Sequence, residues 1–251
     1  PKRAVIGLIS VMVFIAVWQL AAMLELADET LISSPANVFE SMLYYVVNGI
    51  LLQNIWISTL EFLIGMSFAL VIGVLFGLLM GWYKRIGMLL DPLVMTFYTM
   101  PRDALLPVII VWLGIAVASK AAVVFLGAVF PIIVNLVTGI NETDSSLIKA
   151  ARSFGASERE IFQKILLPSC LPYLMAGIRL GIGRGVIGVI VAEMYVSTSG
   201  IGSLIMRAQV GLNADQLIFL VLFTALLGYL LVTGARAVER RVGRWREEAV
   251  Q

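Results

Sequence analysis

Residues 149–168 read Lys149-Ala-Ala-Arg-Ser-Phe-Gly155-Ala-Ser-Glu-Arg-Glu-Ile-Phe-Gln-Lys-Ile165-Leu-Leu-Pro168, a charged, amphipathic segment between two long apolar runs. Asp144 or Ser145 can cap a helix that enters this segment and runs to about Phe154. Gly155 then permits the left-handed backbone turn that ends such a helix. The first half of the segment therefore predicts a helix followed by a sharp turn.

The second half of the segment carries the signals that begin another helix. Ser157 is followed three residues later by Glu160, which is the spacing of a capping box. We expect this helix to cover 158–166 and to stop before Pro168, because the residue before a proline disfavours helical backbone. Together the two halves predict a helix–turn–helix elbow.

The side chains of the predicted elbow fall into three groups. We expect small residues to allow close approach by a partner, basic residues to point outward for ion pairing, and apolar residues to anchor the elbow. The small residues are Ala150 and Ala151. The basic residues are Arg152, Arg159 and Lys164, and the apolar anchors are Leu147, Ile148, Ile161 and Ile165. A solvated loop between two spans is the alternative interpretation, but so many signals at one spacing favour docking.

The composition indicates a membrane protein with several spans. Of the 251 residues, 60% are hydrophobic and 14% are charged, whereas a soluble domain typically has about 25% charged residues. Backbone groups in lipid must be satisfied within each segment, so we expect an all-α polytopic membrane protein. The chain has one cysteine, Cys170, and no histidine, which disfavours multi-cysteine metal sites and histidine-based catalysis.

About six transmembrane helices are predicted from runs of about 20 mainly apolar residues. The expected spans are 5–24, 59–82, 89–113, 121–137, 178–195 and 216–235. Prolines and charged residues interrupt the third, so we expect it to be bent or broken and to face protein or a water-filled path.

The basic residues predict the orientation of the spans. Thirteen of the 18 Lys and Arg residues lie at the ends that these spans place on one side. By the positive-inside rule that side is cytoplasmic, so both termini are expected in the cytoplasm. A short helix from about 36 to 47, begun by Ser34 and Pro35, is expected to cap the bundle at the outer interface.

The elbow resembles the cytoplasmic EAA loop of ABC-importer permeases, through the pattern x-A-A-x-x-x-G followed by I-x-L-P. That loop normally begins with glutamate, and Lys149 reverses the charge here while both alanines and Gly155 remain. Further stretches that resemble the family are 33–35, 101–107, 112–114, 176–179, 191–193, 199–205 and 239–246. The pattern is most similar to the nitrate/sulfonate/taurine/bicarbonate branch.

This resemblance implies a type I ABC-importer permease that forms half of a translocation path. The solute is expected to be a small anion of the nitrate, sulfonate, taurine, bicarbonate or aromatic-acid type. The implied partners are two ATPase subunits, a second permease copy in a homodimer or heterodimer, and an extracytoplasmic solute-binding protein, with no nucleic acid. The implied location is a bacterial-type cytoplasmic membrane, where membrane lipid surrounds the chain.

ATP chemistry is expected on another chain. The sequence contains no G-x-x-x-x-G-K-[ST] motif, so nothing in it is predicted to cradle the phosphates of ATP. We therefore expect this chain not to be an enzyme and to hold no cofactor, with ATP–Mg on the partner ATPase. The resemblance assigns coupling to that ATPase to Lys149, Ala150, Ala151, Arg152, Gly155, Ala156 and Ser157.

A single permease domain is expected over 1–251. It would have an N-terminal span within about 1–30, core spans within 55–240 and the coupling elbow at 144–168. Because the chain starts at Pro1, we expect a short segment to precede it in the complete protein.

Charged residues within the spans are candidates for the translocation path, because such groups are costly in lipid and tend to face the bundle interior. The candidates are Arg102, Asp103, Arg184, Glu193 and Glu61. Structural pairing is the alternative: Glu61 can partner Arg179 or Arg184, while Arg102 and Asp103 can form either a local pair or a gate.

Two neighbouring features have simpler interpretations. Asp215 is expected to cap the last span. The glycines at 181, 183, 185 and 188 lie within an apolar span, and they are expected to permit close helix packing rather than to bind a nucleotide.

An ion-coupled secondary transporter is the alternative function. Such proteins often show inverted repeats and intramembrane carboxylates, and this sequence shows no convincing internal repeat. Loss of uptake on ATP depletion, with ion gradients held constant, separates the two. A membrane enzyme has little support.

Overall fold

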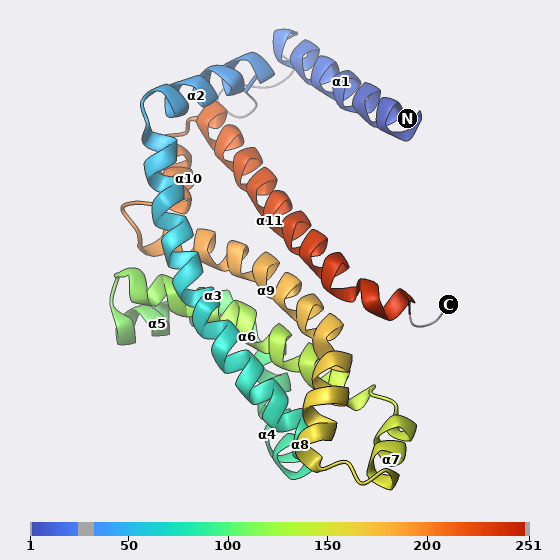
Figure 1. The fold of residues 1–251 in the computed structure, drawn as a ribbon. Coiled ribbons are helices and arrows are strands. Elements are labelled where there is room, and N and C mark those ends of the chain that lie inside the picture. The colour runs from blue at the N-terminus through green and yellow to red at the C-terminus, as the bar shows by residue number, and fades with distance from the viewer. Residues whose placement is uncertain (1, 25–32, 249–251) are drawn as a thin grey trace. The chain divides into compact units, whose positions relative to one another are not determined.

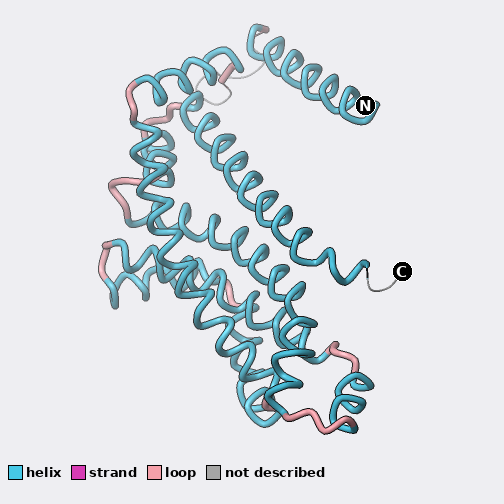
Figure 2. The backbone as a smooth tube through the Cα atoms, in the orientation of Figure 1, coloured by secondary structure: helices cyan, strands magenta, loops and turns pink. Residues whose placement is uncertain are grey.

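The computed structural model describes residues 2–24 and 33–248, and every regular element in these ranges is helical (Figure 1). The elements are α1 (Lys2–Met23), α2 (Pro35–Val47), α3 (Ile50–Trp82), α4 (Lys84–Thr99), η1 (Arg102–Leu105), α5 (Leu106–Leu113), α6 (Val117–Asn141), α7 (Ser145–Ser153), α8 (Glu158–Ile161), η2 (Phe162–Leu166), α9 (Leu167–Val196), α10 (Ile201–Val210) and α11 (Ala214–Glu248). From α2 onward, each element is joined to the next by a short loop or continues directly into it, as the tube in Figure 2 shows. The prediction of an all-α protein is confirmed.

Four of the described helices are long and apolar enough to cross a membrane. They are α3, α6, the continuous helix Glu158–Val196 and the part Ala214–Arg241 of α11. A fifth span results if the bent pair Lys84–Thr99 and Arg102–Leu113 is counted as one. The first of the six predicted spans, 5–24, coincides with α1, whose stretch Met12–Met23 is a shorter apolar helix.

The third predicted span is broken, as the prolines in it predicted. Its two halves, α4 and the η1–α5 segment, meet at an angle of 91°. Met100 and Pro101 have extended backbone at the break, and a proline cannot donate the N–H that would continue a helix. Phe97 of α4 stacks on Phe130 of α6 with ring centroids 5.7 Å apart, which fixes α4 beside α6.

Contacts divide the chain into two compact units, residues 1–58 with 193–227 and residues 59–192 with 228–251. In the first unit α2 begins as predicted, with Pro35 in its first turn and the Ser34 hydroxyl accepting the N–H of Asn37 at 3.2 Å. The cap and the proline together fix the start of this short helix.

Polar contacts hold α2 against the start of α11 in the same unit. The Tyr45 hydroxyl donates to the side-chain oxygen of Gln216 at 3.0 Å, and the Ser41 hydroxyl donates to the Asp215 carboxylate at 2.6 Å. The prediction that Asp215 caps the last span is wrong. This residue lies inside the first turn of α11, and its carboxylate faces Ser41.

Small residues bring α3, α6 and α9 close together in the second unit. A Cβ placed on any of three glycines spaced four residues apart on α3 would come within 3.0 Å of a side chain of α6; these are Gly73, Gly77 and Gly81, which meet Ile132, Leu136 and Ile140. On α9, a Cβ at Gly181 would lie 3.2 Å from Ala128 of α6. Gly181 therefore has the packing role predicted for the glycines of this span.

The helix that follows the elbow does not stop before Pro168, and that prediction is wrong. α8 passes through a π-helical turn, η2, directly into α9, so the helix Glu158–Val196 is continuous over 39 residues. In the π turn the N–H of Leu167 reaches the carbonyl of Phe162. Pro168 directly follows this π turn, at the second position of α9, and the shifted hydrogen-bond pattern of the turn is where a proline without an N–H can be accommodated in a continuous helix.

Candidate coupling and translocation site

The elbow turns at Gly155 through a Schellman motif. The N–H of Gly155 bonds to the carbonyl of Arg152, and the N–H of Ala156 bonds to the carbonyl of Ala151, both at 3.0 Å. Gly155 has a φ of +79°, and a Cβ on it would meet open space. The left-handed conformation costs other residues about 1–2 kcal/mol. Glycine is therefore required by the backbone and not by packing.

Both helices of the elbow start at the predicted caps. The Asp144 carboxylate accepts the N–H of Ser146 at 2.8 Å, and this hydrogen bond lowers the pKa of the carboxyl below its ordinary value. The Ser157 hydroxyl accepts the N–H of Glu160 at 3.3 Å, and the Glu160 carboxylate accepts the N–H of Ser157 at 3.0 Å. The capping box is confirmed, and the ends on either side of the turn are fixed.

Two ion pairs cross or follow the turn of the elbow. Arg152 donates twice to the Glu158 carboxylate, at 3.1 and 3.2 Å, and Lys164 pairs with Glu160 at 3.0 Å. Two of the three basic residues expected to point outward therefore find partners within the elbow itself. Lys149 and Arg159 are exposed, and in the described part of the chain neither forms an ion pair. The outer surface of the elbow thus presents unpaired positive charge.

The apolar side of the elbow packs on the rest of the second unit. Ile161 is fully buried in a cluster with Leu136, Ile140, Leu166 and Cys170, and three of the four predicted anchors reach this cluster: Ile148, Ile161 and Ile165. The fourth, Leu147, is 53% exposed, so its prediction as an anchor is wrong. It lies on the outer side of α7.

The small residues of the elbow divide between its two faces. Ala151 and Ala156 pack against the apolar cluster, whereas Ala150 is exposed. The residue that dominates the exposed face is Phe154, which is 92% exposed at the turn. It was not among the predicted coupling residues, although a large apolar side chain directly before the glycine that ends a helix is a recognisable signal.

Arg184 and Tyr98 come together in the second unit. The Arg184 guanidinium lies 4.6 Å from the centre of the Tyr98 ring, and its Nη2 lies 3.4 Å from the Tyr98 hydroxyl. Arg102, in η1, reaches the same place on α6 as the backbone of Arg184: its Nη1 lies 2.8 Å, and the Arg184 carbonyl oxygen 3.3 Å, from the position of a Cβ on Gly127. No ion pair joins Arg102 to the exposed Asp103 within the described residues. The Arg102 guanidinium, at the break in the third span, therefore lies beside the part of α9 that carries Arg184.

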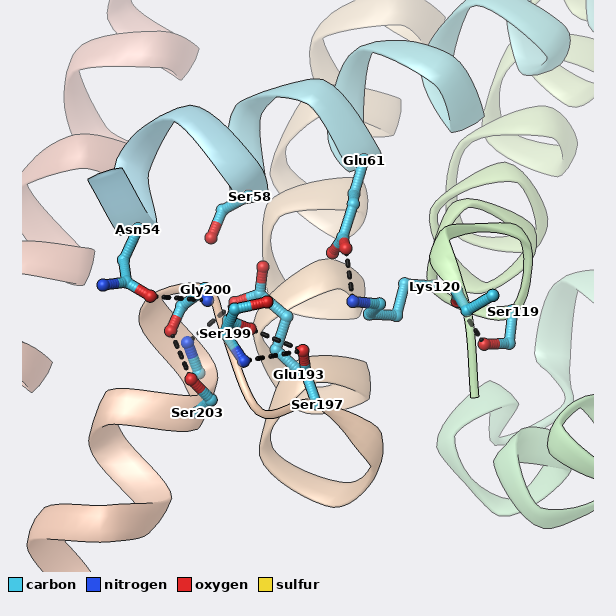
Figure 3. Close-up of polar contacts among 12 residues, drawn as sticks. Asn54, Ser58, Glu61, Ser119, Lys120, Glu193, Ser197, Ser199, Gly200 and Ser203 are labelled. Atoms are coloured by element: carbon cyan, nitrogen blue, oxygen red, sulfur yellow. Dashed lines mark hydrogen bonds and ion pairs between the residues drawn. The ribbon is translucent and has the colours of Figure 1, made fainter. Parts of the chain in front are cut away.

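Glu61 pairs with Lys120 of α6 (Figure 3). Both side chains are buried, with 0% and 6% of their surfaces exposed. The prediction that Glu61 partners Arg179 or Arg184 is wrong, because Arg179 pairs with Glu239 at 2.8 Å. Lys120 was not a predicted site residue, since it lies just before the predicted span 121–137.

Glu193 fastens the loop that precedes α10 in the first unit. Its carboxylate accepts the N–H of Gly202 at 2.7 Å, and it lies so close to Gly200, which has a φ of +96°, that a Cβ there would overlap it. Asn54 accepts the N–H of Gly200 at 2.7 Å, and Ser58 accepts the N–H of Ile201 at 3.0 Å (Figure 3). The contacts give this buried carboxylate a structural role.

Comparison with known proteins gives a consistent result. The family described as "Binding-protein-dependent transport system inner membrane component" matches residues 69–244. The SsuC protein of Escherichia coli (strain K12), named for aliphatic sulfonates transport, is 36% identical over 234 residues, covering 92% of this chain and 88% of that protein. The taurine transport system permease protein TauC of the same strain is 27% identical over 252 residues, covering 98% and 92%.

A solved structure extends the comparison to the fold. A chain of the MetNI methionine ABC transporter, in an inward-facing conformation, matches with a TM-score of 0.66 at 22% identity. The match covers 77% of this chain and 96% of that one. With most of its length matched, the chain belongs to the family of binding-protein-dependent transport system inner membrane components.

Proposed function

We propose that this chain is the permease subunit of an ABC importer in a bacterial cytoplasmic membrane. It would form half of the path for a small, sulfonate-type anion, with a second permease copy forming the other half. Membership of the family and the two relatives named for sulfonate and taurine transport support this proposal. Energy would come from ATP–Mg on two separate ATPase subunits, and a binding protein would deliver the solute.

Coupling to the ATPase is assigned to the elbow at 144–168. The observation that carries this assignment is Phe154, which is 92% exposed on an elbow whose two helix starts are capped and whose turn is a closed Schellman motif. A large apolar side chain held on a rigid, basic projection suits insertion into a partner pocket. Ala150, Lys149 and Arg152 would surround the contact.

Within the path, Arg102 and Arg184 are the groups best suited to attract an anion, and Asp103 lies beside them. Glu61 and Glu193 would support the path indirectly, since each already holds another part of its own unit. The five charged groups proposed for the path thus divide into two carboxylates that stabilise the fold, Glu61 and Glu193, and three groups that form no ion pair within the described residues, Arg102, Arg184 and Asp103.

The coupling assignment can be tested with Gly155→Leu in the complex coexpressed with its native ATPase and binding protein. Leucine is strained at a φ of +79°, and a strain of about 1–2 kcal/mol in the elbow predicts about a tenfold loss of ATP-driven uptake in proteoliposomes. ATP hydrolysis by the assembled complex should persist. The matched control is Gly49→Leu, because Gly49 has a φ of +69° and equally open surroundings.

Two outcomes would count against this function. Normal uptake by Gly155→Leu would remove the coupling role from the elbow. Uptake by the wild-type chain that follows an ion gradient and continues without ATP would favour a secondary transporter.

A further inference from the structure

We propose that Arg102 and Arg184, with Tyr98, form a binding site for the oxyanion head group of the transported solute at the break in the third span. This inference rests on the proposed function, and it assigns the recognition of the anion to named side chains. The site is built from three elements of one compact unit: α4, η1 and α9.

The first part of the site is Arg184 on α9. Its guanidinium lies over the Tyr98 ring, 4.6 Å from the ring centre, in the arrangement of a cation–π contact. The aromatic face and the hydroxyl at 3.4 Å hold the group in place. Neither contact neutralises its charge, so the positive charge of Arg184 remains available.

The second part is Arg102 in η1, which reaches α6 where Gly127 leaves room. Its Nη1 lies 2.8 Å from the position that a Cβ on Gly127 would occupy, and the Arg184 carbonyl lies 3.3 Å from that same position. A side chain at Gly127 would therefore push Arg102 away. The glycine allows the guanidinium to approach the part of α9 that carries Arg184.

The counter-charge within the site is weak, because the exposed Asp103 acts on Arg102 less strongly than Arg184 does. Among the described residues no carboxylate forms an ion pair with either guanidinium, and both side chains are partly buried. Two like charges drawn together away from bulk water oppose folding. An anion bound between them would remove that opposition, so the arrangement favours an occupant with negative charge.

The chemistry of guanidinium selects the class of anion. Each guanidinium presents a planar fork of N–H donors that fits two oxygens of a carboxylate, phosphate or sulfonate group. Irregular backbone at membrane depth is tolerated where it is buried in protein or lines a water-filled path. The break at Met100 and Pro101 supplies such backbone, and Pro101 is exposed, which favours the path. The site thus suits an oxyanion head group that passes through.

The first test measures the reactivity of individual arginines with phenylglyoxal, in the complex of permease and ATPase in lipid nanodiscs. Mass spectrometry of the wild-type complex would give the modification rates of Arg102 and Arg184. Ethanesulfonate at about ten times its dissociation constant should slow both about tenfold, because only the fraction of sites left empty can react. Neutral ethanesulfonamide should not. Arg85, which is exposed on α4, serves as the internal control and should react equally throughout.

Two results of this measurement would overturn the site. Equal modification with ethanesulfonate and ethanesulfonamide would show that no anion is recognised. Slow modification before any sulfonate is added, with no further protection by it, would show that lipid phosphate occupies the arginines.

The second test measures ATP-driven uptake of radiolabelled ethanesulfonate into proteoliposomes. Arg102→Gln and Arg184→Gln should each lower uptake about tenfold or more, whereas the matched control Arg85→Gln should transport like wild type. Normal uptake by both site variants would overturn the inference and leave the proposed function standing. If ethanesulfonate protects both arginines from phenylglyoxal but the wild-type complex shows no uptake, the binding site would stand and the proposed function would fail.

Discussion

Two pairs of charged residues in the same compact unit differ in whether their charges are neutralised within the protein. Lys120 and Glu61 are buried almost completely and neutralise each other, whereas Arg102 lies beside the α9 backbone at Arg184 and, in the described chain, neither arginine forms an ion pair with a carboxylate. Removing a charge from water costs several kcal/mol unless another charge offsets it. We infer that Lys120 and Glu61 stabilise the fold, whereas Arg102 and Arg184 bind a negatively charged ligand.

The largest effect is expected from Lys120→Met, which leaves the buried Glu61 without its cation. Breaking a buried pair typically costs about 3–5 kcal/mol, so thermal unfolding of the purified complex in detergent should begin at a clearly lower temperature. The double variant Lys120→Met with Glu61→Leu should recover most of the loss. A single variant as stable as wild type would contradict the structural role of the pair.

A smaller effect is expected where an ion pair is partly exposed. Arg179 and Glu239 retain 28% and 24% of their side-chain exposure, so Arg179→Met should cost about 1–2 kcal/mol, between the values for exposed and buried pairs. Chemical unfolding in detergent would measure it, with Glu239→Gln as the variant of nearly equal size. If Arg179→Met lowered the free energy of unfolding as much as Lys120→Met, the loss would not depend on how deeply the ion pair is buried.

The contact between Arg184 and the Tyr98 ring predicts a still smaller loss of stability. Tyr98→Leu should lower the free energy of unfolding by about 0.5–1 kcal/mol through loss of the cation–π contact, and it should raise the phenylglyoxal reactivity of Arg184. Tyr98→Phe retains the ring and should behave almost like wild type. If both variants release Arg184 equally, the hydroxyl and not the ring is responsible.

The smallest effect on stability is expected from Arg184→Met. Removal of an uncompensated cation relieves its desolvation cost, so the free energy of unfolding should stay within about 0.5 kcal/mol of wild type or rise. Uptake should fall at the same time. The opposite result, a loss of stability like that of Lys120→Met, would show that Arg184 also serves the fold.

Local signals explain what the sequence could predict. The caps at Asp144 and Ser157 and the turn at Gly155 depend on residues within a few positions of one another, and all three were found where predicted. The broken third span followed from its prolines in the same way. Each of these features is decided by backbone chemistry that does not require a neighbouring helix.

Contacts between distant residues could not be predicted. Tyr98 and Arg184 are 86 positions apart, and their meeting depends on how the helices pack. The helix end expected before Pro168 failed for another reason: the rule assumes regular α-helical hydrogen bonding, and the π turn shifts that pattern. Phe154 was missed because its place before Gly155 marks the end of a helix but does not reveal that its side chain is exposed.

The continuous helix from Glu158 to Val196 has a mechanical consequence. At about 1.5 Å per residue its 39 residues form a lever arm about 58 Å long, compared with a hydrocarbon core of about 30 Å. Glu158, beside the turn of the elbow, and Arg184 lie on this one rod, about 39 Å apart. A partner that tilts the elbow would therefore move Arg184 relative to Arg102. The helix between the elbow and Arg184 is interrupted only by the π turn and by Pro172.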